Sequence, residues 1–332
     1  MSAREPVIRV EDLHVWFELP NGGELHAVQG VSFELREGER MGLVGESGCG
    51  KTTTILAMMG LLPATASVSG KVILEGEDIL VGGEETISPH RWNDIAMVFQ
   101  GAMNAFNPVK TVGEQIAEPM VLHEKATGKG ARARVAELLE LVGISGERAD
   151  RYPHEFSGGM RQRAAIAMAL ACSPKVLLAD EPTTALDVMV QAQILELLVS
   201  LSTTLGQELG LTVILVTHDL PVVAQVCDRA AVMYAGEIVE MGGMSTIYHD
   251  PRHPYTRMLF AATPDLLGDD EVISIPGAPP RLDRELVGCP FRPRCDSVFE
   301  PCATVHPRRL ELGPGHEALC HLNDAAVTEA VS

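Results

Sequence analysis

Residues 156–163 read Phe-Ser-Gly-Gly-Met-Arg-Gln-Arg, and this stretch decides the fold more than any other part of the chain. Ser157, Gly158 and Gly159 carry no bulky side chain, and the Ala-rich residues 160–171 that follow have helical character. Ser157 suits the N-cap of that helix, and backbone N–H groups at a helix N-terminus attract anions. The turn therefore predicts an anion site at the start of a helix.

A second anion site is predicted upstream, where residues 45–52 read Gly-Glu-Ser-Gly-Cys-Gly-Lys-Thr. This matches the phosphate-loop pattern G-x-x-x-x-G-K-S/T, and it lies between a predicted strand and a predicted helix, as the motif requires. The glycines let backbone N–H groups surround phosphates, Lys51 reaches the β- and γ-phosphates, and the Thr52 hydroxyl ligates Mg²⁺. Because the flanks fit, a chance glycine-rich turn is the weaker interpretation. Cys49 is interpreted as a small filler.

Polar residues end three predicted strands. The apolar run 176–179 ends at Asp180 and Glu181, of which Asp180 suits Mg²⁺ and Glu181 is free to activate an attacking water. His218 follows the predicted buried strand 212–217, at a strand end where α/β sheets bind ligands. Gln100 follows the run 95–99. A solvated strand end or a structural histidine is the alternative at each place, so these assignments depend on the phosphate loop.

The remaining periodicity organises the chain. Strand patterns occupy 8–17, 31–35, 41–44 and 72–74, and helical spacing occupies 112–120, 131–142 and 185–201. This alternation predicts an α/β fold with a mostly parallel sheet. Composition shifts near residue 245, which predicts an accessory region from 246 to 322 and a disordered tail over 323–332.

Composition narrows the class of protein. The 332 residues, 46% of them hydrophobic, suffice for one large or two modest cores. The net charge of −19 disfavours nucleic acid, because binders of duplexes present a basic face. The absence of a long apolar run and of a signal-peptide core predicts a cytosolic protein that reaches the membrane only through a partner.

Four cysteines crowd the C-terminal region: Cys289, Cys295, Cys302 and Cys320. In a reducing cytosol such a group indicates a metal or cluster site more than disulfides. Four thiolates suit zinc or an iron–sulfur cluster, and the spacing C-x5-C-x6-C-x17-C is loose for zinc. Unligated thiols stay open as an alternative, and so does ligation by a neighbouring histidine. The candidates are His306, His316 and His321.

Taken together, the motifs resemble those of an ATP-binding-cassette (ABC) ATPase, in complete order over about residues 7–260. The resemblance implies an ABC-type P-loop ATPase core over 1–245, with an antiparallel β-subdomain and a helical signature subdomain near 101–160. It also implies the residues that bind ATP, with Phe17 stacking on adenine and Trp16 as the neighbouring candidate. The others are Gly45, Glu46, Ser47, Gly48, Cys49, Gly50, Lys51, Thr52, Thr53, Gln100 and Asp180.

Within this family pattern the roles divide. Thr52, Gln100 and Asp180 are implied to hold Mg²⁺, Glu181 to act as catalytic base and His218 to steady the γ-phosphate. A separate set is implied to serve the ATP of a partner subunit: Ser157, Gly158, Gly159 and Asp187. The signature departs from the common Leu-Ser-Gly-Gly-Gln at Phe156 and Met160, which puts the contact of the usual glutamine side chain in doubt.

Three stretches resemble the dipeptide and oligopeptide importers in particular: the glutamine loop 99–108, the His-Pro-Tyr segment 250–256, and residues 275–295. The resemblance implies a loop-rich extension that carries a [4Fe–4S] cluster on its four cysteines. It implies an ATPase at the cytoplasmic face of the membrane that powers peptide uptake. Its partners would be a second, paralogous cassette in a heterodimer, two transmembrane permease subunits and, indirectly, an extracytoplasmic binding protein.

Other functions stay open at this stage. The same architecture could import an oligosaccharide or a metal chelate. A soluble cassette working in DNA repair or translation is disfavoured, because the chain lacks coiled-coil insertions and is acidic. An export cassette is disfavoured by the His-Pro-Tyr extension and by the absence of fused membrane helices.

Overall fold

The computed structural model describes residues 5–20, 22–101, 105–208, 211–262, 274–284 and 286–331. The chain divides into two compact units, each assembled from separate segments. One unit comprises Met1–Ile8, Glu34–Arg40 and Leu74–Val216, and the other comprises Arg9–Phe33, Met41–Ile73 and Thr217–Ser332. The division does not follow the predicted boundary at residue 245, so the predicted domain limits stay a prediction.

The first unit is built on three parallel strands. They are β6 (Ile95–Val98), β7 (Val176–Asp180) and β8 (Thr212–Thr217), in the order β8-β7-β6. Every residue of the three strands is buried, as expected of parallel strands covered on both faces. The runs predicted as strands therefore end where the structure ends them, to within one residue, and Gln100 and Glu181 follow β6 and β7.

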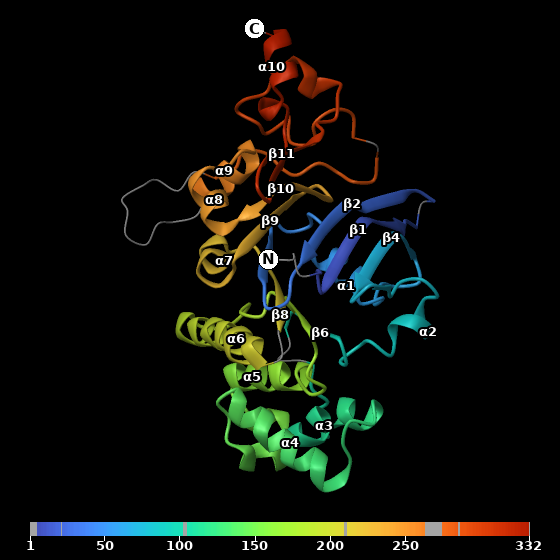
Figure 1. Cartoon of the computed structure of the whole chain (residues 1–332), viewed down its shortest axis with the longest axis vertical. Helices are drawn as coiled ribbons and strands as arrows, with labels where there is room; N and C mark the ends of the chain where they lie inside the picture. Colours follow the sequence, from blue (N-terminus) through green and yellow to red (C-terminus); the bar gives the residue numbers. More distant parts are fainter. Residues whose placement is uncertain are drawn as a thin grey trace. The chain divides into compact units, whose positions relative to one another are not determined.

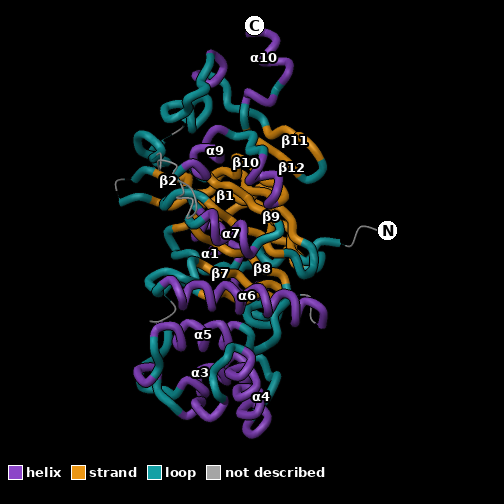
Figure 2. Tube along the Cα trace, turned by 90° about the vertical axis from the view of Figure 1, so that its left-hand side faces the viewer, coloured by secondary structure: helices purple, strands orange, loops and turns teal. Residues whose placement is uncertain are grey.

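Helices make up the rest of this unit: α2 (Glu84–Ile87), α3 (Val112–Leu122), α4 (Gly128–Leu141), α5 (Gly158–Ala169) and α6 (Val188–Glu208). Figures 1 and 2 show α3, α4 and α5 grouped together. Helix α3 begins at Val112 because Thr111 and Glu114 form a capping box, in which each side chain accepts the backbone N–H of the other. Short 3-10 turns at Gly146–Asp150 and Pro153–Glu155 lead into α5.

Two groups of strands form the second unit. One comprises β1 (Ile8–Glu18), β2 (Glu24–Leu35) and β4 (Ala66–Leu74), ordered β2-β1-β4. The short β5 (Glu77–Asp78) falls in the segment Leu74–Val216 of the first unit. The other begins with β3 (Arg40–Val44), which runs parallel to β9 (Arg229–Tyr234). Antiparallel strands β10 (Glu237–Gly243), β12 (His316–Leu319) and β11 (Arg309–Gly313) follow in that order.

The helices of this unit are α1 (Lys51–Met58), α7 (Leu220–Val226), α8 (Met244–His249), α9 (Pro254–Ala261) and α10 (Ala325–Val331), with 3-10 turns at Glu300–Ala303 and His321–Asn323. Helix α10 lies where sequence predicted a disordered tail. It forms because Asp324 binds its first turn, accepting the N–H of Ala326 on Oδ1 and of Thr328 on its carbonyl.

The C-terminal segment, by which we mean the residues from 246 onward, is joined to strand β10 through a buried carboxylate. Strand β12 pairs with β10, and Glu240 lies opposite Ala318. The Glu240 side chain is fully buried, accepting the N–H of Arg252 at 2.7 Å, the N–H of His253 at 2.9 Å and a hydrogen bond with His316 Nε2 at 2.9 Å. Since a buried carboxylate is tolerated only when fully paired, these contacts fix the segment on β10.

Within the described ranges, none of the helices has both the length and the apolar composition needed to cross a bilayer.

Candidate nucleotide site

The phosphate loop, residues 45–52, begins directly after β3, and its last two residues, Lys51 and Thr52, form the start of α1. Its three glycines have positive φ, 152° at Gly45, 80° at Gly48 and 111° at Gly50. A Cβ at Gly45 would lie 2.1 Å from the Met233 carbonyl oxygen, and one at Gly50 would lie 2.6 Å from that of Ala27. Glycine is therefore required here both by the backbone conformation and by the neighbouring backbone.

Lys51 lies inside the loop that it closes. Its side chain is buried, and Nζ donates to the carbonyl oxygens of Gly45 at 2.7 Å and Glu46 at 3.0 Å. Ser47, Gly48 and Thr52 are exposed, whereas Cys49 and Lys51 between them are buried. Cys49 is buried as the filler interpretation expected, and burial raises the pKa of its thiol.

Glu46 is held by residues that sequence reasoning did not connect to the loop. Its N–H donates to Tyr255 Oη at 2.9 Å, and burial raises the pKa of that phenol. Its carboxylate accepts two hydrogen bonds from Arg294, NH1 to Oε2 at 2.6 Å and NH2 to Oε1 at 2.9 Å. Both partners lie in the stretches that resemble peptide importers, which is the one signal that could have drawn attention to them.

The aromatic candidates for adenine occupy adjacent positions of β1. Trp16 stacks with His14 and His26, at centroid distances of 5.2 Å and 4.6 Å. Burial, followed by the neighbouring His14, lowers the pKa of His26 and favours the neutral form of that ring. Since the Trp16 ring is committed to these histidines, the half-buried Phe17 is the better candidate.

In the first unit, Glu181 follows Asp180, whose side chain is buried at the end of β7. Glu181 Oε2 accepts from Gln100 Nε2 at 2.8 Å and from Thr184 Oγ1 at 2.9 Å. Its backbone is left-handed, with φ of 43°, a strained conformation that recurs at functional sites. The structure thus brings the predicted base and the predicted glutamine together and adds Thr184, which sequence reasoning missed.

The Ser-Gly-Gly turn opens α5 as predicted. Ser157 Oγ accepts the N–H of Met160 at 3.3 Å and caps the helix. A Cβ on Gly159 would lie 2.6 Å from Val190 Cγ1, so this glycine also makes room for the start of α6. Asp187 Oδ1 accepts the N–H of Val190 at 3.0 Å, which places the predicted aspartate at the first turn of the same helix.

His218 is exposed immediately after β8, and Asp219 caps α7 by accepting the N–H of Val222 at 3.4 Å. Part of the predicted glutamine loop, residues 102–104, lies outside the described residues. Each unit therefore presents its own set of predicted residues: the phosphate loop, Phe17 and His218 in one, and Gln100, Asp180, Glu181, Asp187 and the Ser-Gly-Gly turn in the other.

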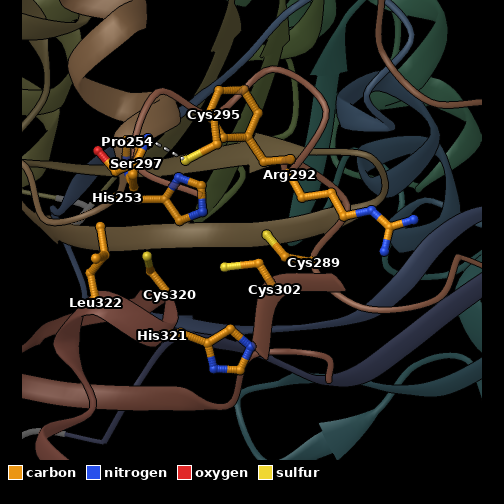
Figure 3. A pocket seen from close by; sticks show the side chains of 11 residues that line it. His253, Pro254, Cys289, Arg292, Cys295, Ser297, Cys302, Cys320, His321 and Leu322 are labelled. Atoms are coloured by element: carbon orange, nitrogen blue, oxygen red, sulfur yellow. Dashed lines mark hydrogen bonds between the residues drawn. The ribbon is translucent and has the colours of Figure 1, made fainter. Parts of the chain in front are cut away.

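The four C-terminal cysteines line one pocket, shown in Figure 3 with their sulfur atoms around a common space. Burial raises the pKa of Cys289 to about 12 and of Cys320 to about 11, so both thiols stay protonated unless a cation compensates them. In the described part of the chain, no group of three or more His, Cys, Asp or Glu side chains is placed to hold a metal ion.

The histidines considered as further ligands are distributed differently. His306 contacts Glu237 at 3.0 Å and His316 contacts Glu240 at 2.9 Å, whereas His321 lines the cysteine pocket. His253, which sequence reasoning did not single out as a ligand, lines it too; burial lowers its pKa to about 3, and the neutral ring accepts the N–H of Tyr255.

Comparison with known proteins agrees with these motifs. The family model described as ABC transporter matches residues 28–184, and that described as the oligopeptide/dipeptide transporter C-terminal region matches residues 239–302. The chain therefore belongs to the ABC transporter family, and it is an ATPase.

The relatives specify the branch. The chain is 46% identical over 332 residues to the dipeptide transport ATP-binding protein DppD of Bacillus subtilis, covering 98% of each. It is 44% identical over 319 residues to the oligopeptide transport ATP-binding protein OppD of Escherichia coli, covering 95% of this chain and 93% of that protein.

Solved structures bear out the predicted cassette fold. An ATP-binding cassette solved as a dimer after hydrolysis, with ADP and Pi, superimposes with a TM-score of 0.62 at 28% identity, covering 71% of this chain and 98% of that one. The protein cbiO1 from Clostridium perfringens, part of the complex cbiONQ, gives a TM-score of 0.62 at 29% identity, covering 74% of this chain and 92% of that one.

Proposed function

We propose that this ATPase powers the uptake of dipeptides or oligopeptides through membrane permease subunits. The observation that carries the proposal is the C-terminal segment, which matches the oligopeptide/dipeptide transporter region and contacts the phosphate loop through Tyr255 and Arg294. End-to-end similarity to relatives named for dipeptide and oligopeptide transport supports it. The protein would then work at the cytoplasmic face of the membrane, held there by the permeases.

The ATP site is proposed from the family pattern and the geometry within each unit. Phe17 stacks on adenine, residues 45–53 surround the phosphates, and Lys51 exchanges its two loop carbonyls for phosphate oxygens. Glu181, oriented by Gln100 and Thr184, withdraws a proton from the attacking water. His218 donates a hydrogen bond to the γ-phosphate.

Magnesium fits the oxygen donors proposed for it. The Thr52 hydroxyl, the Gln100 amide oxygen and the Asp180 carboxylate are hard ligands of the kind that Mg²⁺ prefers. The ion would supply charge neutralisation at the β- and γ-phosphates when ATP is bound.

The Ser-Gly-Gly turn is proposed to serve the ATP of a second cassette. Ser157, Gly158 and Gly159 present a helix N-terminus to the triphosphate, and Asp187 lies at the adjacent first turn of α6. We take the second cassette to be a paralogue. Met160 replaces the usual glutamine, so this turn would bind phosphate through backbone and serine groups alone.

An iron–sulfur cluster is proposed for the cysteine pocket. Cys289, Cys295, Cys302 and Cys320 provide the four sulfurs that [4Fe–4S] clusters use, and they line a single pocket, although no three of them are placed to hold one metal ion. The cluster would supply a crosslink to a segment of short elements, and would stabilise the thiolates that burial disfavours. Iron and sulfide content together with visible absorption of anaerobically purified protein tests this directly; zinc or bare thiols would contradict it.

The transport proposal is tested by reconstituting the chain with its permeases and second cassette in lipid vesicles. We expect ATP hydrolysis to rise when a peptide-loaded binding protein is added, and not with the same protein unloaded. Stimulation by an oligosaccharide-loaded or chelate-loaded binding protein instead would overturn the cargo. Failure of the chain to copurify with any permease would overturn the transporter role. A Lys51→Ala variant controls for contaminating ATPases.

A further inference from the structure

Arg294 is a buried cation whose partners converge from distant parts of the chain. Its side chain is 2% exposed, and the guanidinium holds both oxygens of the Glu46 carboxylate. Nε donates to the Pro276 carbonyl oxygen at 2.8 Å, and NH1 lies 3.5 Å from Tyr234 Oη. The Glu46 side chain is 30% exposed, but the two parallel hydrogen bonds and the buried guanidinium fix the geometry of this pair more firmly than that of a surface ion pair.

Three packed aromatic rings set the position of this cation. Tyr234 and Tyr255 have ring centroids 4.6 Å apart, and Phe291 lies 5.2 Å and 5.4 Å from them. All three are fully buried, and the Arg294 guanidinium carbon lies 5.8 Å from the Tyr234 ring centroid. The same Tyr255 accepts the Glu46 N–H, so the ring cluster grips Glu46 at both its backbone and, through Arg294, its carboxylate.

The contacts of Tyr255 and Arg294 with Glu46 matter for nucleotide binding because of where Glu46 lies. It is the second residue of a loop whose task is to surround a triphosphate, and its carbonyl oxygen accepts a hydrogen bond from Lys51. An unpaired carboxylate at this position would repel phosphate and draw Lys51 away from it, because charges interact strongly where water is partly excluded. Removing Arg294 would also leave the Glu46 carboxylate, only 30% exposed, without its paired cation.

We propose that Arg294, together with Tyr255, is a positioning residue for ATP binding, which neutralises Glu46 and fixes the phosphate loop from the C-terminal segment. The inference rests on the proposed nucleotide site. It assigns the segment a direct part in nucleotide affinity, beyond any part in docking or cluster binding. Phe291, which lines the cysteine pocket, and Arg294, which precedes Cys295, connect that pocket to the loop.

A double-mutant cycle tests the charge relation on the full chain. The affinity for a fluorescent ATP analogue is measured for the wild type, Arg294→Gln, Glu46→Gln and the double variant. We expect Arg294→Gln to weaken ATP binding about tenfold or more, because losing a hydrogen bond between charged groups commonly has an effect of this size. The double variant should recover most of that loss, because it no longer leaves a carboxylate unpaired. Arg281→Gln, which removes an exposed arginine paired with Asp283 in the same segment, is the matched control.

Other outcomes overturn the inference. Unchanged affinity in Arg294→Gln would show that the loop does not depend on the cation. Equal loss in the single and double variants would assign Arg294 a packing role only. Should Arg294→Gln fail to fold, Tyr255→Phe removes just one hydroxyl, and unaltered ATP affinity there would sink the proposal. Lys51→Ala tests the nucleotide site separately: if it binds ATP normally, the proposed site is wrong irrespective of Arg294.

Discussion

Two helix N-termini in this molecule are proposed to bind phosphate, and they use glycine for different reasons. In the phosphate loop, Gly45, Gly48 and Gly50 all have positive φ, so the backbone itself demands them. In the Ser-Gly-Gly turn, Ser157 caps α5 from an extended conformation, and Gly159 has no positive φ but lies against Val190.

Glycine is required by the backbone torsion angles in the phosphate loop and by the clearance from Val190 in the Ser-Gly-Gly turn. In the phosphate loop, positive φ angles require glycine at all three positions, and Lys51 donates to two carbonyl oxygens of the same loop. The Ser-Gly-Gly turn owes its form to a cap and to the packing of the next helix. Similar glycine-rich sequences thus need glycine for its backbone torsion angles in the phosphate loop and for its lack of a side chain in the Ser-Gly-Gly turn.

The largest expected effect comes from Glu181→Gln. Replacing the base should lower hydrolysis by about 10²–10⁴-fold, the usual contribution of a positioned base, while ATP remains bound. The stalled complex would let both anion sites be examined with the same nucleotide in place. Phosphate release and retained radiolabelled ATP are the measurements, and Glu181→Asp serves as the charge-preserving control. Undiminished turnover would refute the assignment of the base.

Gly159→Ala tests the space argument. The added methyl would meet Val190 Cγ1 at 2.6 Å, and overpacking of this kind costs about 1–3 kcal/mol. Urea unfolding should show the loss, and a second change, Val190→Ala, should restore most of it. If the double variant is no more stable than Gly159→Ala, the glycine serves something other than clearance.

Gly48→Ala tests the torsion argument. A Cβ there meets nothing within 4 Å, but φ is 80°, and a left-handed alanine costs about 1–2 kcal/mol. We expect ATP affinity to fall several-fold with no neighbouring change able to restore it. Gly76→Ala, with φ of 90° and equally open space, is the matched control, expected to lower stability without altering affinity for ATP. Equal affinity loss in both would contradict a local role.

Ser157→Ala should have the smallest effect on folding, about 1 kcal/mol for a lost N-cap. Combined with Glu181→Gln, it should also weaken the ATP-held dimer, measured by size-exclusion chromatography with ATP. Ser157→Thr keeps the hydroxyl and should behave like the parent in both assays. A dimer indifferent to Ser157→Ala would limit the residue to capping.

Sequence reasoning succeeded where one local signal determines structure. Residues 176–179 and 213–216 are unbroken apolar runs, a pattern typical of parallel strands that are buried on both faces. It missed the β9–β10 hairpin, whose two-residue turn is Ala235-Gly236, both with positive φ. The usual sequence signal of such a two-residue turn is Asn-Gly, and the alanine found here does not indicate a turn. Gln29 supports the turn instead, donating Nε2–H to the Ala235 carbonyl at 3.0 Å.

The candidate site was predictable to the same extent. The phosphate loop (45–52), the predicted base Glu181 and the signature turn (156–160) each lie in a short continuous stretch of sequence, so each can be recognised without knowing the fold. The Arg294–Glu46 contact joins residues 248 positions apart, and neither side chain implies the other. Only the packing of Tyr234, Tyr255 and Phe291 brings them together, and no periodicity in the chain encodes that cluster.

The buried Glu240 carries a practical consequence for dissecting this protein. Its three partners, the N–H groups of Arg252 and His253 and the His316 ring, all lie beyond residue 245. A minimal cassette cut at that residue would keep the carboxylate and lose every group that satisfies it. It would also uncover the edge of β10 that β12 protects, and open edges of this kind recruit other chains. Truncation there would yield a self-associating fragment, not a simplified enzyme.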